Sequence, residues 1–281
     1  MQAATRFGRT VKFPRLPPTM HIVPVPVRDD NYAYLLIDEP SKKAAAVDPY
    51  DVAKVVSAAE KLGVELVAGI TTHHHYDHSG GNEKFASTFP GITIYGGSDK
   101  TPALTQLVKD KDEFTIGENI HVKCLATPCH TQDSICFHVT DPTNNNHPGG
   151  VFTGDTLFIG GCGRFFEGTA PEMVSALNYL ATLPSSTVVL NGHEYTAGNL
   201  AFAKSIEPES EGVKRLEELV ANNKITTGLT TIGDEKEWNV FMRLGNSAVR
   251  ASAKVSSDTP ESKVMEALRE LKNNFRGLPR L

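Results

Sequence analysis

Few cysteines, no long apolar run and no strong excess of charge characterise this sequence of 281 residues. Disulfide scaffolds are short and dense in cysteine, so Cys124, Cys129, Cys136 and Cys162 are predicted to be free thiols in a reducing compartment. No apolar run approaches the roughly 18 residues that suggest a transmembrane helix. The net charge of −5 and the pI of about 6.1 do not indicate a nucleic acid or an anionic membrane as a partner.

Acidic residues are absent from the first 28 positions, which carry Arg6, Arg9, Lys12, Arg15 and Arg28. This composition resembles a mitochondrial transit peptide, although serine is missing and prolines would end any helix early. The alternative is a disordered tail without a targeting role. Met20 directly precedes the first strand-like segment, so a shorter product beginning there would remain cytosolic. We therefore expect a cytoplasmic location, a location in the mitochondrial matrix, or both.

Strand and helix patterns are intermixed up to about residue 195. Strands are predicted at 21–37, 44–47, 66–72, 92–95, 120–126, 134–139, 150–153 and 187–190. Helices are predicted at 51–62 and at about 171–183, the second beginning at Pro171. Such a mixture favours sheet layers covered by helices, which predicts a mixed α/β domain over residues 20–195 after a basic extension at 1–19.

Residues 196–281 are predicted to form a helical domain. Helical patterns cover 196–223 and 258–276, and Asp258 or Thr259 could cap the last helix. The apolar stripe of that helix consists of Val264, Leu268, Leu271 and Phe275.

Residues 72–81, THHHYDHSGG, carry the strongest chemical signal. His73 and His75 are two positions apart and point to the same side of an extended segment, and Asp77 and His78 follow directly. Imidazole and carboxylate ligands suit zinc, iron or manganese, and the lack of cysteine ligands argues against a purely structural zinc site. The alternative, a solvent-exposed histidine-rich loop or tag, fits poorly with an interrupted run in mid-chain. His74 points the other way, which predicts a supporting role.

Three further ligand-type residues each follow a predicted strand: His130, Asp155 and His193. Loops at the carboxyl ends of strands form the sites of α/β proteins, so we expect these residues to join the histidine loop. His21, His121, His138 and His147 lack this context and are predicted to be structural or surface residues.

This pattern resembles the metallo-β-lactamase superfamily and, within it, the glyoxalase II (hydroxyacylglutathione hydrolase) family. Further similarity lies in residues 153–158, 161–169, 192–196 and 237–243. The resemblance implies an αββα sandwich, followed by the helical domain, with two divalent metal ions. It implies that one ion is bound by His73, His75 and His130, that the other is bound by Asp77, His78 and His193, and that Asp155 bridges them.

The resemblance also implies a glutathione site. Arg269 and Lys272 match a basic pair that holds the glycine carboxylate, and each lies about 100° from the predicted stripe, free to face a pocket. The alternative is an ordinary solvated basic face. Tyr195 could supply a hydroxyl, and Arg164 replaces a lysine that is frequent in the family. Phe166 replaces a frequent tyrosine, so it can contact glutathione only by packing.

The activity implied by the resemblance is hydrolysis of S-D-lactoylglutathione to D-lactate and glutathione, the second step of methylglyoxal detoxification. Zinc is the first expectation, with iron or manganese as alternatives, and Asp77 could orient the attacking hydroxide. A monomer is expected. Two alternatives remain: a glutathione-persulfide dioxygenase with a single iron, and a non-catalytic binder of glutathione conjugates.

Overall fold

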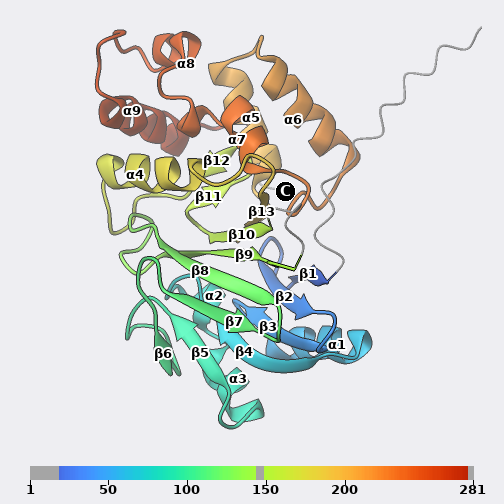
Figure 1. The fold of residues 1–281 in the computed structure, drawn as a ribbon. Helices are drawn as coiled ribbons and strands as arrows, with labels where there is room; N and C mark the ends of the chain where they lie inside the picture. Colours follow the sequence, from blue (N-terminus) through green and yellow to red (C-terminus); the bar gives the residue numbers. More distant parts are fainter. Residues whose placement is uncertain (1–18, 144–148, 278–281) are drawn as a thin grey trace, which may run out of the picture.

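Two facing β-sheets lie between two helical layers in the computed structural model, which describes residues 19–143 and 149–277 (Figure 1). Residues 1–18, which carry most of the predicted targeting segment, and His147 fall outside the described residues. The first sheet has the order β1 (Met20–Pro26), β2 (Tyr32–Asp38), β3 (Lys43–Val47), β4 (Glu65–Ile70), β5 (Thr93–Gly96) and β6 (Gln106–Leu107). The second has the order β13 (Val188–Asn191), β10 (Gly150–Gly154), β9 (Ile135–Thr140), β8 (Ile120–Ala126) and β7 (Glu113–Ile116). A small hairpin of β11 (Leu157–Phe158) and β12 (Gly161–Cys162) follows β10.

Helices cover the outer face of each sheet (Figure 1). The first sheet is covered by α1 (Val52–Leu62) and α3 (Asn82–Thr88), and the short α2 (Tyr76–Ser79) precedes α3. The second is covered by α4 (Ala170–Ala181) and by the helices that follow β13. These are α5 (Thr196–Ile206), α6 (Glu211–Asn222), α7 (Ile232–Trp238), the 3₁₀ helix η1 (Val240–Met242), α8 (Ser247–Ser252) and α9 (Glu261–Asn274).

Three apolar clusters hold these layers together. The first lies between the sheets and includes Leu36 and Phe137, and the second joins the first sheet to α1 and α3 through Ile37 and Phe85. Leu36 and Ile37 are neighbours on β2 and point to opposite faces, so that strand is buried on both sides. The third cluster joins the second sheet to α4 and to the helices after residue 195. The C-terminal helices therefore share their core with the second sheet.

Strand direction brings five loops to one edge of the sandwich. β3 and β4 are parallel, and so are β10 and β13. β8 is antiparallel to β9, which is antiparallel to β10, so β8 runs in the same direction as β10 and β13. At this edge the two sheets are tied by a bridge between Asn31 and His193 and by a 2.9 Å hydrogen bond from Tyr32 N to Gly192 O.

Several predicted elements need correction. Residues 21–37 form a hairpin of two strands rather than one strand, with Val27 N donating to Asn31 O at 3.0 Å across the turn. Residues 196–223 form two helices, because Ser210 caps a new helix through its hydroxyl. The last helix begins at Glu261 without a side-chain cap, since Asp258 accepts a bond from Ser256 instead. The two-residue strands β6, β11 and β12 were not predicted, because such short strands cannot show an alternation of apolar and polar residues.

The prediction of free thiols is confirmed, because all four cysteines are buried and none forms a disulfide. Within residues 19–143 and 149–277, no helix has both the length and the apolar composition needed to cross a bilayer.

Candidate metal centre and active site

The loop after β4 presents the clustered histidines at the shared edge of the two sheets. His73 is buried, His75 is the residue before α2, and α2 itself carries Asp77 and His78. The Nε2 atom of His73 lies 3.1 Å from His75 Nδ1, and the Nε2 atom of His130, after β8, lies 3.0 Å from the same atom. These three side chains could hold one metal ion, since each offers a ligand atom within 4.8 Å of the others.

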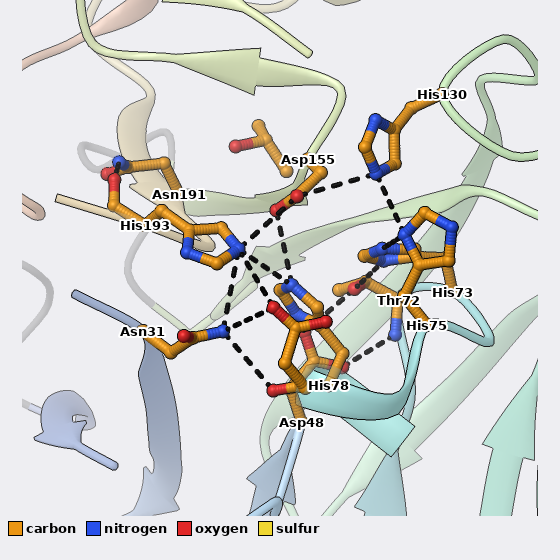
Figure 2. Close-up of polar contacts among 12 residues, drawn as sticks. Asn31, Asp48, Thr72, His73, His75, His78, His130, Asp155, Asn191 and His193 are labelled. Carbon is orange, nitrogen blue, oxygen red and sulfur yellow. Dashed lines mark hydrogen bonds and ion pairs between the residues drawn. The ribbon is translucent and has the colours of Figure 1, made fainter. Parts of the chain in front are cut away.

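A second group of ligand-type side chains adjoins the first. His193, after β13, places its Nε2 atom 3.2 Å from His78 Nε2 and 3.5 Å from Asp77 Oδ2. Asp155 lies between the groups, because its Oδ2 is 3.4 Å from His130 Nε2 and 3.3 Å from His193 Nε2 (Figure 2). The structure thus brings together all seven residues that the sequence singled out as metal ligands.

The side chains of this cluster fit divalent cations. Asp155 Oδ1 is buried and lacks a hydrogen bond of acceptable geometry among the described residues, although His78 Nε2 lies 3.2 Å away. Ring nitrogens of different histidines face one another at 3.0–3.2 Å, where neutral rings can share at most one proton. Buried acceptors that converge in this way are satisfied when a cation lies among them.

Polar residues outside the cluster fix the orientation of its ligands. Asp48 Oδ2 accepts bonds from Thr72 Oγ1 at 2.7 Å and from His78 Nδ1 at 2.8 Å, and Asp48 Oδ1 accepts from Thr72 N at 2.8 Å. His130 Nδ1 donates to the carbonyl of Arg164 at 2.9 Å. A proton held on Nδ1 leaves Nε2 as the metal ligand, so each contact selects the tautomer that the centre needs.

The β1–β2 turn supplies two more supporting side chains. Asp30 Oδ1 lies 3.1 Å from His193 Nδ1, and Asn31 Nδ2 donates to Asp77 Oδ2 at 3.1 Å. Sequence reasoning missed Asp30 and Asn31, because it predicted a single strand through this turn. It also missed Asp48, which could have been found because it follows a predicted strand as His130 and Asp155 do.

Burial and charge divide the histidines into two classes. Burial, followed by the nearby His78, holds the pKa of His73 well below its usual value, and burial also lowers the pKa of His130. Burial opposes charge on His78 as well, but Asp155 and Asp48 raise its pKa well above the usual value. Burial works against the Asp155 carboxylate, yet His193 and His78 hold its pKa well below the usual range. The centre therefore stabilises positive charge between Asp48 and Asp155.

Aromatic side chains flank the mouth of the centre. The Phe166 side chain is 62% exposed, and its ring centroid lies 5.7 Å from that of His75 and 5.2 Å from that of His130. Tyr195 stacks on His193 with centroids 4.7 Å apart. These two rings form an aromatic wall next to the candidate ligands.

Arg269 and Lys272 of α9 lie in different surroundings. Lys272 Nζ donates to Gly198 O at 2.7 Å and lies 5.0 Å from the centre of the Phe202 ring. Arg269 is only 8% exposed, whereas Leu271, which was predicted to belong to the buried apolar stripe, is 38% exposed. Arg269 and Arg164 both line a cavity of about 600 Å³ between α9 and residues 164–171.

Two family descriptions match the chain in succession. Residues 56–193, which include every candidate metal ligand, match the metallo-beta-lactamase superfamily, and residues 194–275 match the hydroxyacylglutathione hydrolase C-terminus. A probable hydroxyacylglutathione hydrolase from Schizosaccharomyces pombe is 45% identical over 91% of this chain and 99% of its own length. The chain belongs to the hydroxyacylglutathione hydrolase family.

Other relatives of the family give the same picture. The cytoplasmic hydroxyacylglutathione hydrolase of Arabidopsis thaliana is 41% identical over 92% of this chain and all of the relative. The mitochondrial one of Saccharomyces cerevisiae is 39% identical over 90% of this chain and 96% of the relative. The crystal structure of ETHE1 from Myxococcus xanthus has a TM-score of 0.62 at 24% identity and covers 93% of this chain and 92% of its own, a likeness of fold. The α/β sandwich of this family is thus shown, and the metallo-β-lactamase fold together with the histidine and aspartate cluster implies divalent metal binding.

Proposed function

We propose that this chain hydrolyses the thioester of S-D-lactoylglutathione to D-lactate and glutathione, the second step of methylglyoxal detoxification. The observation that carries the proposal is the position of Asp155 between two complete ligand groups, in a member of the hydroxyacylglutathione hydrolase family. A carboxylate between two groups of three ligands suits a binuclear hydrolase, and a single-metal site has no use for the second group.

The proposed ligand assignment follows the two groups. In this assignment His73, His75 and His130 would hold one ion and Asp77, His78 and His193 would hold the other, with Asp155 as a ligand shared by both. Zinc is the proposed metal, with iron and manganese accepted by the same ligand set. Two such ions would lower the pKa of a water to about 7 and polarise the thioester carbonyl.

The protein groups around the centre have proposed roles of their own. Asn31 holds Asp77 through Oδ2, so this carboxylate has a fixed direction from which to orient the attacking hydroxide. The departing thiol has a pKa of about 8.5, so it leaves as thiolate without a strong general acid. The rings of Phe166 and Tyr195 form an aromatic wall beside the centre.

The substrate is proposed to lie over this wall toward α9. Arg164, Arg269 and Lys272 supply the positive charge for the glycine carboxylate of glutathione, and the Tyr195 hydroxyl supplies a further contact. Phe166 has no hydroxyl and contributes packing alone. We further propose residues 20–195 as the catalytic part, 196–281 as the substrate-binding part, and a monomer in solution.

The proposal is tested by assaying the purified chain on S-D-lactoylglutathione and measuring the metals in the same sample. Stoichiometric release of D-lactate and glutathione with two metal ions per chain is expected. One iron per chain with consumption of oxygen on glutathione persulfide would instead identify the dioxygenase. Tight binding of a glutathione conjugate without turnover by the metal-loaded chain would identify a binding protein.

For location, we propose that a chain with the basic extension at residues 1–19 enters mitochondria and that a chain beginning at Met20 stays in the cytoplasm. Relatives named for each compartment support this proposal. A fluorescent fusion of residues 1–28 should reach mitochondria, and diffuse fluorescence from that fusion would reject targeting.

A further inference from the structure

Residues 162–164 lie between the C-terminal helix α9 and the candidate metal centre. They end the β11–β12 hairpin, and they precede the segment that carries Phe166. The side of this turn that faces the centre and the side that faces α9 are each held by a different set of contacts.

On the inner side, the turn is packed against two candidate ligands. The carbonyl of Arg164 accepts the 2.9 Å hydrogen bond from His130 Nδ1. A Cβ added at Gly163 would lie 1.9 Å from Asp155 O and 2.9 Å from His130 Nδ1, so only glycine allows the backbone to approach this closely. The Gly163 amide also donates to Thr156 O at 3.3 Å. The position of the turn therefore sets the position of the acceptor for His130.

On the outer side, the turn is held by one side chain of α9. Arg269 Nη1 donates to the carbonyl of Cys162 at 3.1 Å and lies 3.5 Å from that of Gly163. Its Nε donates to Asn273 Oδ1 at 2.9 Å, and its guanidinium lies 5.4 Å from the centre of the Phe241 ring. These contacts hold the planar guanidinium against the backbone of the turn.

An ordinary structural ion pair does not explain why Arg269 is buried. It is almost fully buried, and among the described residues no carboxylate pairs with it. Burying a cation without a counter-ion is unfavourable unless hydrogen bonds compensate it. The compensating acceptors are the carbonyls of the turn that carries the acceptor of His130.

We propose that Arg269 is a positioning residue for the metal ligand His130. It acts through the carbonyls of Cys162 and Gly163, which keep the Arg164 carbonyl where it can accept the proton of His130 Nδ1. His130 then presents Nε2 to the centre in the required tautomer. This role rests on the metal centre of the proposed function and differs from carboxylate binding, because it reaches the metal before any substrate is present.

The test compares Arg269→Ala with Arg250→Ala in the full-length, metal-loaded protein. Arg250 is a matched control: its Nη1 likewise donates to backbone carbonyls, those of Ser256, Ser257 and Thr259, but in a loop that contributes nothing to the centre. Loss of a supporting contact to a metal-binding histidine weakens metal binding about 10–100-fold. Arg269→Ala should therefore weaken the binding of one of the two zinc ions by about that factor in a chelator competition, and it should lower kcat. Arg250→Ala should lower only the melting temperature.

A second variant separates positioning from packing. Arg269→Met keeps the apolar stem against Phe241 and removes every donor, so it should show the same loss of one zinc ion even if Arg269→Ala does not fold. Nitrogen-15 spectra of the imidazoles should also lose the tautomer signature of His130 in this variant. Wild-type zinc affinity for both ions and an unchanged His130 signal in Arg269→Met would overturn the proposal. Because zinc affinity is measured without substrate, a wild-type chain that binds two ions but does not hydrolyse the thioester would refute the proposed function and leave this inference standing.

Discussion

Asp155 lies between the two candidate ligand groups. It is 8% exposed, and its two carboxylate oxygens face His78, His130 and His193 at 3.2–3.4 Å. The surrounding imidazoles hold its pKa well below the usual value, so it is a carboxylate at every pH at which the protein would work. Gly192 is needed beside it, because a Cβ there would lie 2.4 Å from Asp155 Oδ1.

Replacing this carboxylate should remove metal and activity together. In Asp155→Ala, metal analysis should find fewer than two ions per chain and kcat should fall by at least about 100-fold, since the two groups lose their shared ligand. Asp38→Ala is the matched control, because Asp38 is also buried and accepts bonds from Glu118 N and Asn119 Nδ2 away from the centre. Two ions and normal turnover in Asp155→Ala would show that the bridge assignment is wrong.

His74 illustrates how a residue between two candidate ligands serves a different purpose. Its Nδ1 lies 2.7 Å from Asp133 Oδ1 and its Nε2 lies 3.7 Å from Glu167 Oε1, so its ring nitrogens contact carboxylates outside the two candidate ligand groups. Alternation along the extended segment predicted a supporting role for this residue. The contact connects the ligand loop with the segment that carries Phe166.

At the scale of the element, Arg269 and Lys272 of α9 extend into different surroundings. Arg269 is turned into the β12 turn, while Lys272 lies toward α5 and the Phe202 ring. Burial, reinforced by the neighbouring charge of Arg269, lowers the pKa of Lys272 to about 8.

Lys272→Ala should raise KM for S-D-lactoylglutathione and leave kcat nearly unchanged. A hydrogen bond to a charged group contributes about 1.5–3 kcal/mol, which corresponds to roughly tenfold or more in KM. The contact is remote from the thioester and acts equally in ground and transition states, so kcat is spared. The charged form of Lys272 is lost as the pH rises through about 8, so KM of the wild type should climb above that pH while KM of the variant stays flat. A KM unchanged at pH 7 would contradict this role.

A buried carboxyl group in α7 anchors the helices to the β11–β12 hairpin. Glu235 is fully buried and accepts bonds from Gly160 N at 2.9 Å, from Trp238 Nε1 at 3.0 Å and from Asn239 Nδ2 at 3.0 Å. Burial outweighs these donors and raises its pKa to about 7.

Glu235 should therefore make stability depend on pH. The folded state holds its proton up to about pH 7, whereas an unfolded chain releases it near the usual value of 4.5. The stabilising contribution is complete below the unfolded pKa and is lost as the pH rises through about 7. The free energy of unfolding of Glu235→Gln should consequently fall less than that of the wild type between about pH 5 and pH 8. Denaturant titrations of both proteins at these two pH values measure the difference. Parallel pH profiles for the two proteins would contradict the raised pKa.

At the scale of the whole molecule, the centre joins the two sheets. His73, His75 and His78 follow a strand of the first sheet, and His130, Asp155 and His193 follow strands of the second. An ion held by both sets is a cross-link between the layers that only the folded state can form.

Removal of metal should therefore lower the melting temperature of the whole chain in one transition. A ligand at 100 times its dissociation constant stabilises the folded state by about 2.7 kcal/mol, and a kcal/mol shifts the melting temperature of a chain near this size by about 2–4 °C. Dialysis against a chelator should lower the melting temperature by about 5–10 °C in calorimetry, and added zinc should restore it. A melting temperature that does not respond to chelation, in a sample shown to have lost its metal, would exclude this cross-link.

The sequence by itself determined the chemistry of the centre. Four ligand-type residues lie within six positions after one strand, and His130, Asp155 and His193 each follow another predicted strand. These signals are local, because neighbouring residues set both the alternation along a strand and the point where the strand ends. Strands that run in the same direction then end at the same edge of the sheet. The αββα layering could be anticipated for the same reason, together with the family resemblance.

Only the tertiary structure decided which residues support that centre. Asp48, Asp30 and Asn31 contact candidate ligands that lie far from them in sequence, and local patterns did not resolve the hairpin turn that carries Asp30 and Asn31. Arg269 and Cys162 are 107 positions apart, and helical spacing placed the arginine about 100° from the apolar stripe, facing a pocket, without indicating this contact. It is buried because α9 docks against the β12 turn, and docking depends on the shapes of two surfaces that are separate along the chain. No periodicity within either segment encodes that contact.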